Sequence, residues 1–247
     1  MTDESVIFMN TIKIDKYFRG MIAHRGLSGI ETENTINAFI AAANRSYYGI
    51  ECDVHASKDG EIIITHDDTL LRLGLLNIHI PSYSYDEIRK FTLIDRKTGN
   101  LSDKIVIPLL SDYLSICQTY QKHAVIELKE GLSLANIDDV VKSIRKEYNT
   151  DDVSLISFND KYLSYVRKNY PEINLFYLTN KMSEKIYDFC QKNQFNLDIL
   201  ATEITEADIK RFHLLGLKVA VFTVNDKEQA ERLIKMGVDY ITTDILE

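Results

Sequence analysis

The sequence predicts an α/β protein folded as a closed (β/α)₈ TIM barrel. Two observations carry this prediction: short apolar, β-rich runs alternate with segments of helical period, and eight such runs fit within 247 residues. The predicted strands are residues 21–24, 49–55, 124–128, 153–157, 174–178, 199–202, 218–223 and 240–243. The predicted helices are residues 35–45, 110–120, 137–148, 161–169, 184–193, 206–215 and 227–236.

Capping residues support the predicted helix boundaries. Asn34 precedes the first helical segment and is a suitable N-cap. Thr205 is followed three residues later by Asp208, which is the spacing expected where a helix begins. Gly237 follows the last helical segment, where a glycine commonly ends a helix in the left-handed conformation.

The second strand and the turn after it gather the most chemistry. Alternate side chains of a strand share a face, so Glu51 and Asp53 point the same way. The pair Asp59-Gly60 favours a tight reversal, and residues 61–65 then run back as a short β-branched strand. This return brings His66 near the two carboxylates, where an imidazole can move protons at neutral pH.

Two irregularities qualify the barrel prediction. Residues 68–108 contain no clear βα unit and are too many for an ordinary loop, so we interpret them as an insertion after the second strand. Either its polar side chains shape a substrate entrance or it is a small structural cap with a helix over 86–91. The side chains considered for the entrance are Arg72, Tyr83, Tyr85 and Arg89. No eighth helix follows Asp244, and we expect residues 12–18 to cover the bottom or flank of the barrel instead.

Composition limits the classes of function. A formal charge of −8 and a pI near 5.3 argue against a nucleic-acid surface, which is normally basic. Three scattered cysteines suggest neither a disulfide framework nor a metal cluster. The sequence starts without a basic, apolar leader, and no apolar run approaches the roughly 18 residues of a membrane span. We therefore expect a soluble, cytoplasmic protein with one domain over residues 1–247, whose oligomeric state stays open.

Polar residues cluster where the predicted strands end. Catalytic groups of such barrels come from the carboxyl ends of the strands and the loops that follow. His24 and Arg25 end the first strand, while Glu127 and Lys129 lie two apart on the third and share a face. Three carboxylates from two strands suit a hard divalent cation such as Ca²⁺ or Mg²⁺ better than zinc.

Eight short motifs follow one another along the chain at these same positions. They are IAHRG at 22–26, ENT at 33–35, ECDVHASKDG at 51–60, HD at 66–67, ELK at 127–129, SF at 157–158, TVN at 223–225, and GVD at 237–239 followed by ITTD at 241–244. In this order and over nearly the whole chain, they resemble the glycerophosphodiester phosphodiesterase family. Each motif alone is weakly specific.

The resemblance implies a barrel with a small insertion after the second strand and a metal-dependent hydrolase. The expected substrate is a small glycerophosphodiester, which is split into glycerol 3-phosphate and an alcohol. By resemblance, the metal ligands are Glu51, Asp53 and Glu127, the acid and base pair is His24 and His66, and the phosphate contacts are Arg25 and Lys129. Related barrels that act on lysophospholipids, or that bind phosphodiesters without turnover, are the alternatives.

Some residues depart from the family pattern or have simpler explanations. Thr32, Phe222 and Tyr240 stand where proline, tryptophan and glycine are usual, and none of these changes removes a reacting group. Asn225 and Asp244 can be structural residues of the barrel rim. Four further histidines are expected to lack a reacting role. His55 is expected to be structural or to support the reacting groups, and the others are expected at the surface or in the insertion, namely His79, His123 and His213.

Overall fold

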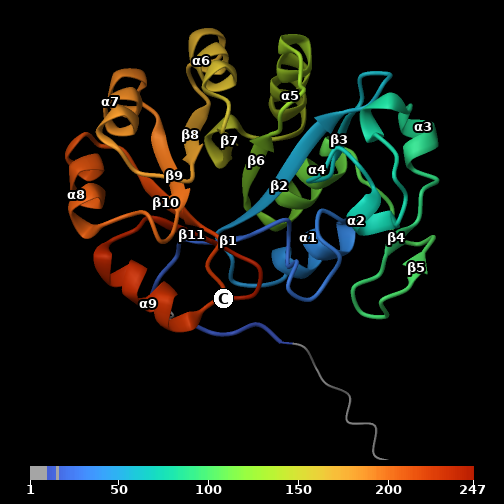
Figure 1. Cartoon of the computed structure of the whole chain (residues 1–247), viewed down its shortest axis with the longest axis horizontal. Helices are drawn as coiled ribbons and strands as arrows, with labels where there is room; N and C mark the ends of the chain where they lie inside the picture. The colour runs from blue at the N-terminus through green and yellow to red at the C-terminus, as the bar shows by residue number, and fades with distance from the viewer. Residues whose placement is uncertain (1–9, 15–16) are drawn as a thin grey trace, which may run out of the picture.

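A computed structural model describes residues 10–14 and 17–247. Within them, eight parallel strands follow the order β1-β11-β10-β9-β8-β7-β6-β2, and pairing of β1 with β2 closes the ring. The predicted closed barrel is therefore confirmed (Figure 1). The strands are β1 (Met21–Ala23), β2 (Gly49–Ala56), β6 (His123–Leu128), β7 (Val153–Ser157), β8 (Asn174–Thr179), β9 (Asn196–Leu200), β10 (Val219–Phe222) and β11 (Tyr240–Thr243).

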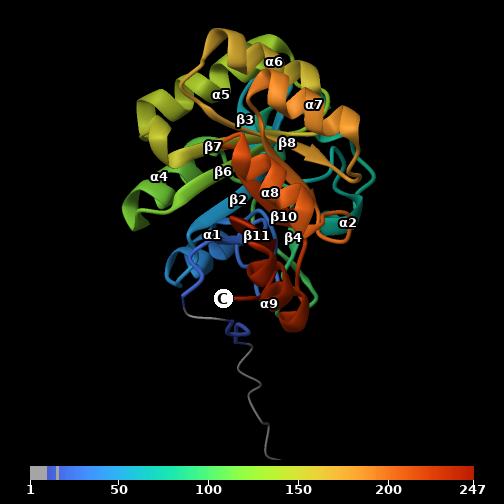
Figure 2. The same cartoon turned by 90° about the vertical axis from the view of Figure 1, so that its left-hand side faces the viewer.

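Helices cover the outside of the barrel (Figure 1 and Figure 2). They are α1 (Ile36–Ala43), α4 (Leu110–Tyr120), α5 (Leu134–Glu147), α6 (Asp160–Asn169), α7 (Glu184–Asn193), α8 (Glu206–Leu214) and α9 (Lys227–Met236), with a short 3₁₀ turn η2 (Thr150–Asp152) before β7. Helix α5 buries an apolar stripe of Ile137, Val140, Val141 and Ile144, whereas α7 buries Cys190 alone. In the part of the chain that the structure describes, no helix is long and apolar enough to cross a membrane.

The predicted helix signals at the end of the chain are confirmed, and the one at the first helix is wrong. Thr205 and Asp208 form a reciprocal capping box, and Gly237 ends α9 at φ 96°. Helix α1 is instead capped by Thr35, whose hydroxyl accepts from the backbone of Ala38. Asn34 adopts φ 55° and turns its side chain inward, a conformation that asparagine tolerates better than most residues.

Strand β9 also begins earlier than predicted. The prediction was residues 199–202, but the structure has Asn196–Leu200. Asn196 and Asp198 interrupt the apolar pattern that marks a buried strand, yet both side chains are buried. The amide of Asn196 is satisfied by the side chain of Asn174, which explains why a polar residue fits there.

A hairpin extends the second strand beyond the ring. β3 (Ile62–Ile64) pairs antiparallel with β2, with Val54 opposite Ile64. The reversal uses Gly60 at φ 91°, a conformation that favours glycine. The backbone N–H of Thr65 then donates to the carbonyl of Asp53 at 3.0 Å, so the following residue, His66, returns to the mouth of the barrel.

The insertion after β3 folds against its own small apolar core. It contains α2 (Leu71–Gly74), η1 (Ile80–Ser82), α3 (Tyr85–Ile88), β4 (Leu93–Ile94) and β5 (Leu101–Ser102), which lie together on one side of the barrel (Figure 1). Tyr83 packs against Phe91, and the hydroxyl of Tyr85 donates to a backbone carbonyl, so both belong to the cap. Arg89 faces outward near Asp86, whereas Arg72 reaches the barrel mouth.

The segment before the barrel runs beside the end of the chain. The N–H of Ile12 donates to Ile245, and the N–H of Glu247 donates back to Ile12, so this part of the predicted 12–18 segment covers a flank of the barrel. The side chain of Glu247 also accepts from the backbone and hydroxyl of Ser46, just after α1. Residues 15–16 of the predicted segment lie outside the described residues.

Candidate active site

The polar residues predicted at the strand ends meet in one cavity at the carboxyl-terminal mouth of the barrel. The cavity has a volume of about 220 Å³. Six of the seven predicted site residues line it: His24, Arg25, Glu51, His66, Glu127 and Lys129. The seventh, Asp53, is 1% exposed and lies beside them, within 3.3 Å of Arg25 Nε and 3.4 Å of Lys129 Nζ.

Glu51, Asp53 and Glu127 form a compact acidic cluster. Asp53 on β2 is in direct register with Glu127 on β6, and Glu51 lies two residues earlier on the same face of β2. One carboxylate oxygen from each residue lies within 4.8 Å of the other two. Three carboxylate oxygens at this spacing could serve as part of the oxygen shell of a hard divalent cation, with water or substrate supplying the rest.

The electrostatics of the cluster favour a bound cation. Burial, followed by the charge of Asp53, raises the pKa of Glu127 to about 7 and raises the pKa of Glu51 well above its usual range. Burial acts in the same direction on Asp53, but Arg25 and Lys129 outweigh it and hold its pKa at about 2. Among the described residues, the Oδ1 atom of Asp53 is buried without a hydrogen-bond partner, with Lys129 Nζ 3.4 Å away, and its buried carboxylate oxygens suit Ca²⁺ or Mg²⁺.

Two positively charged side chains, Lys129 and Arg25, lie against the acidic cluster. Lys129 Nζ donates to Glu127 Oε1 at 2.9 Å. Arg25 has a left-handed backbone at φ 55°, and this conformation lets its N–H donate to Glu51 Oε2 at 2.8 Å. The Nε atom of Arg25 is buried 3.3 Å from Asp53 Oδ2, so the guanidinium is ion-paired with the cluster as well as hydrogen-bonded to Glu33, and it brings positive charge that suits a phosphate to the cavity wall.

Each of the two predicted histidines is held by a carboxylate. His24 Nδ1 lies 2.7 Å from Asp244 Oδ1, and His66 Nδ1 lies 2.7 Å from Asp67 Oδ1. A carboxylate at Nδ1 fixes the tautomer and leaves Nε2 for a second partner. Burial lowers the pKa of His66, which favours its neutral form at neutral pH.

The sequence assigned no reacting role to the partners of these histidines. Asp244, expected as a structural residue of the rim, also accepts hydrogen bonds from Ser28 Oγ and Asn225 Nδ2. Burial raises the pKa of Asp244, but His24 and these two donors outweigh it and hold that pKa at about 2. Asp67 follows His66 directly, which is the signal that identifies it. Asn34, expected as a cap, donates instead to Asp53 Oδ2 at 2.8 Å.

Arg72 of the insertion connects the two halves of the site, a link that sequence reasoning missed. Its guanidinium makes two hydrogen bonds to Glu33, at 2.6 and 2.8 Å, and Glu33 accepts from Arg25. Its Nε donates to Asp67 Oδ2 at 2.8 Å, while the other oxygen of Asp67 holds His66. One side chain therefore supports both a phosphate-binding candidate and a proton-transfer candidate.

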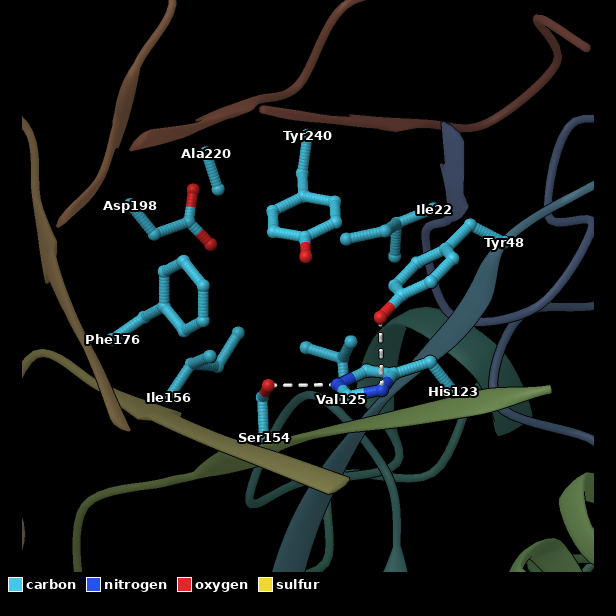
Figure 3. A pocket seen from close by; sticks show the side chains of 10 residues that line it. All are labelled: Ile22, Tyr48, His123, Val125, Ser154, Ile156, Phe176, Asp198, Ala220 and Tyr240. Carbon is cyan, nitrogen blue, oxygen red and sulfur yellow. Dashed lines mark hydrogen bonds between the residues drawn. The ribbon is translucent and has the colours of Figure 1, made fainter. Parts of the chain in front are cut away.

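A second, much smaller cavity lies in the amino-terminal half of the barrel (Figure 3). Its volume of about 10 Å³ has room for about one water molecule. His123 faces it, bonded to Ser154 Oγ at 2.8 Å and stacked on Tyr48, so the prediction of a surface position was wrong (Figure 3). Burial lowers the pKa of His123 to about 4. Asp198 lines both cavities, and its Oδ1 has no hydrogen-bond partner in the part of the chain that the structure describes. Burial raises the pKa of Asp198 to about 8.

Comparison with known proteins gives similar chains of the same length. A glycerophosphodiester phosphodiesterase from Caldanaerobacter subterraneus is 32% identical over 228 residues, covering 91% of this chain and 93% of that one. One from Bacillus altitudinis is 28% identical over 233 residues, covering 91% and 94%.

A solved structure is similar to this chain in both fold and sequence. A phosphodiesterase from Oleispira antarctica, in complex with the product sn-glycerol-3-phosphate, superposes with a TM-score of 0.85 at 26% identity, covering 94% of this chain and 95% of that one. The model of the glycerophosphoryl diester phosphodiesterase family matches residues 24–247. That match spans almost the whole barrel and every residue of the cavity described above, and the chain therefore belongs to the glycerophosphoryl diester phosphodiesterase family.

Proposed function

We propose that this protein hydrolyses glycerophosphodiesters to glycerol 3-phosphate and an alcohol. The observation that carries the proposal is the convergence, in one cavity, of a three-carboxylate cluster, an arginine and a lysine paired with it, and two carboxylate-anchored histidines. The names of the relatives and the product bound in the Oleispira antarctica protein support the same substrate class.

The cation-binding residues in this proposal are Glu51, Asp53 and Glu127, and Ca²⁺ or Mg²⁺ suits their oxygen ligands. When bound, the cation would supply Lewis-acid stabilisation of negative charge at phosphorus. Arg25 and Lys129 offset the same charge through charge-assisted hydrogen bonds. Asn34 donates a hydrogen bond to Asp53 Oδ2, and the other oxygen, Oδ1, would be the one to bind the cation.

His24 and His66 act as the acid and base pair. One imidazole Nε2 takes the proton of the attacking hydroxyl as the new O–P bond forms, and the other gives a proton to the alcohol oxygen as its bond to phosphorus breaks. Asp244 and Asp67 keep each ring in the tautomer that this transfer needs. The attacking oxygen belongs either to water or to the glycerol 2-hydroxyl, which would give a cyclic phosphate first.

Lysophospholipid hydrolysis is a second candidate, which one observation favours. The insertion exposes three leucines near Arg72, and exposed apolar side chains of this kind can contact lipid. Their exposed fractions are 57% for Leu71, 65% for Leu75 and 40% for Leu76. Faster turnover of lysophosphatidylcholine than of glycerophosphocholine would make this the main activity.

The proposed function is tested by product release. Purified protein with Mg²⁺ or Ca²⁺ should release glycerol 3-phosphate from glycerophosphocholine, a chelator should stop the reaction, and added metal should restore it. A barrel that only binds phosphodiesters would release nothing under any of these conditions, and that result would refute the proposal.

The cluster can be tested separately from the reaction. Glu127→Gln should lower Mn²⁺ affinity and turnover together, by more than the roughly 10–100-fold that loss of an outer-shell partner costs. Glu228→Gln, at an exposed position in the first turn of α9, is the matched control and should bind metal normally. Full activity of the Glu127→Gln protein in chelator would exclude the cation site.

A further inference from the structure

A groove of about 430 Å³ opens beside the candidate active site. It shares His66, Glu127, Lys129 and Phe158 with the cavity that holds the acidic cluster. His24, Arg25 and Glu51 line only that cavity, whereas residues 67–69 line only the groove, as do Leu128 and Glu130. A diester whose phosphate is held at Arg25 and Lys129, with its glycerol at the cluster, therefore extends its other substituent into the groove.

The groove carries negative charge that is not neutralised. Among the described residues that line it, Lys129 is the one lysine or arginine, and this ammonium is already paired with Glu127 and Asp53. Glu130 is held at both oxygens by the amide of Asn159, at 3.2 and 3.1 Å, and a neutral donor positions the carboxylate without offsetting its charge.

Asp68 lies on the other side of the groove. Its side chain is 60% exposed, and its ion-pair partner is the imidazole of His79, with Nε2 at 3.6 Å, beyond hydrogen-bond distance. Asp68 comes from the start of the insertion and Glu130 from the loop after β6, and in the described part of the chain neither carboxylate pairs with a lysine or an arginine. The groove between them therefore has a negative potential.

An aromatic ring completes the lining. Phe158 is 42% exposed and contributes to both the groove and the cavity. Phe222 packs against it edge to face at 6.1 Å, which fixes the ring. An organic ammonium is attracted to an aromatic face and to carboxylates together, and this combination recognises quaternary ammonium groups.

We propose that this groove binds the leaving alcohol of the substrate and selects alcohols that carry an ammonium group, such as choline or ethanolamine. The inference rests on the proposed function, because it assigns the groove to the departing half of the same diester. Neutral polyols and anionic alcohols are the disfavoured substituents.

The test compares two diesters that differ only in charge. Glycerophosphocholine and its carbon isostere, the 3,3-dimethylbutyl ester of glycerol phosphate, have nearly the same shape. Choline is the more acidic alcohol and so the better leaving group in any site, and the contribution of the groove is therefore the part of the rate ratio that is lost in groove variants. We expect kcat/KM to favour the choline ester by roughly 5–30-fold at low salt, and the ratio should fall as ionic strength rises. Equal rates on both esters overturn the ammonium selectivity alone, whereas no turnover of either ester overturns the proposed hydrolysis.

Variants identify the groups responsible. Asp68→Asn and Glu130→Gln should each bring the choline to dimethylbutyl ratio closer to one, and Phe158→Leu should do the same by removing the aromatic face. Glu228→Gln, on the outside of the barrel, should keep the ratio of the unmodified protein. An unchanged ratio in the Asp68→Asn, Glu130→Gln double variant would refute the groove as the selective element.

Discussion

His24 and His66 differ in what surrounds their carboxylate partners. Asp244 receives hydrogen bonds from Ser28 and Asn225 as well as from His24, whereas Asp67 shares its second oxygen with the charged Arg72. In both rings the carboxylate occupies Nδ1, so under the proposed function each Nε2 would serve one of the two proton transfers. The histidines are the residues whose loss should be felt most directly in the chemical step.

Replacing either histidine should slow turnover. His24→Ala and His66→Ala should each lower kcat by about 10²-fold or more, the usual contribution of general acid or base catalysis. The pH profile of the unmodified protein should be bell-shaped and should report macroscopic constants of the pair. Wild-type turnover by the His66→Ala protein would remove His66 from the reaction.

The leaving group can tell the acid from the base. A proton on the departing oxygen matters for a poor leaving group such as choline and hardly at all for nitrophenolate. A glycerophospho-nitrophenol should therefore rescue the variant that lacks the acid and leave the other slow. Arg25→Ala should slow both substrates alike, because it acts on the phosphate; rescue of neither histidine variant would contradict the division of roles.

At the scale of elements, the insertion does more than cover the barrel. Helix α2 supplies Arg72, which holds Glu33 with two hydrogen bonds and Asp67 with a third. The fork of a guanidinium suits two carboxylates at once, and a lysine offers no such planar geometry. Arg72 is therefore a positioning residue for Arg25 and His66.

Loss of Arg72 should affect the reaction more than the fold. We expect Arg72→Ala to lower kcat by roughly 10–100-fold, as loss of an orienting partner does, and to shift the limb of the pH profile that belongs to His66. Arg72→Lys should recover little of this. Arg89→Ala, at an exposed position of the same insertion, should change neither quantity, and an unshifted profile in Arg72→Ala would assign Arg72 a purely structural role.

The side chains that share a face of a strand could be predicted from the sequence, whereas the contacts made by irregular segments could not. The alternation of a strand fixes a face, so Glu51 and Asp53, or Glu127 and Lys129, could be paired without a structure. Arg72 comes from a segment that has no periodicity, and nothing in its spacing shows that it reaches Asp67.

The errors have physical causes as well. Asn34 is as good a cap by composition as Thr35, and only its left-handed backbone directs it to Asp53. The predicted start of β9 was wrong because Asn196 and Asp198 are polar. A barrel interior can accept polar side chains, and a search for apolar runs excludes them. The predicted position of His123 was wrong for the same reason, because Ser154 and Tyr48 provide hydrogen-bond partners for its two ring nitrogens at the small cavity.

At the scale of the whole molecule, Asp198 carries a cost to stability. Its ordinary pKa of 3.8 rises to about 8 in the folded barrel, first through burial and then through the charge of Glu127. An acid with a raised folded pKa keeps its proton when folded and releases it on unfolding. The contribution of Asp198 to the free energy of unfolding therefore falls as pH rises from about 4 to about 8 and is constant above that range.

Removing this proton equilibrium should stabilise the protein at higher pH. Asp198→Asn should unfold at a higher urea concentration at pH 8 than the unmodified protein, and the advantage should grow from pH 4 by at most about 1.4 kcal/mol per pH unit. Both proteins are compared in chelator, and Asp86→Asn, with a side chain that is 86% exposed, is the control. An advantage that does not change with pH would mean that Asp198 ionises normally.

Because β1 pairs with β11, the site around His24 can be completed only after almost the whole chain has been synthesised. His24 follows the first strand, and its partner Asp244 follows the last, 220 positions later. On a ribosome, the histidine emerges early and stays without that partner until β11 has been made. A chain broken off before Tyr240 lacks both the strand that seals the ring and the carboxylate that orients His24. Such fragments should be inactive, so translation of a truncated mRNA should give no active hydrolase.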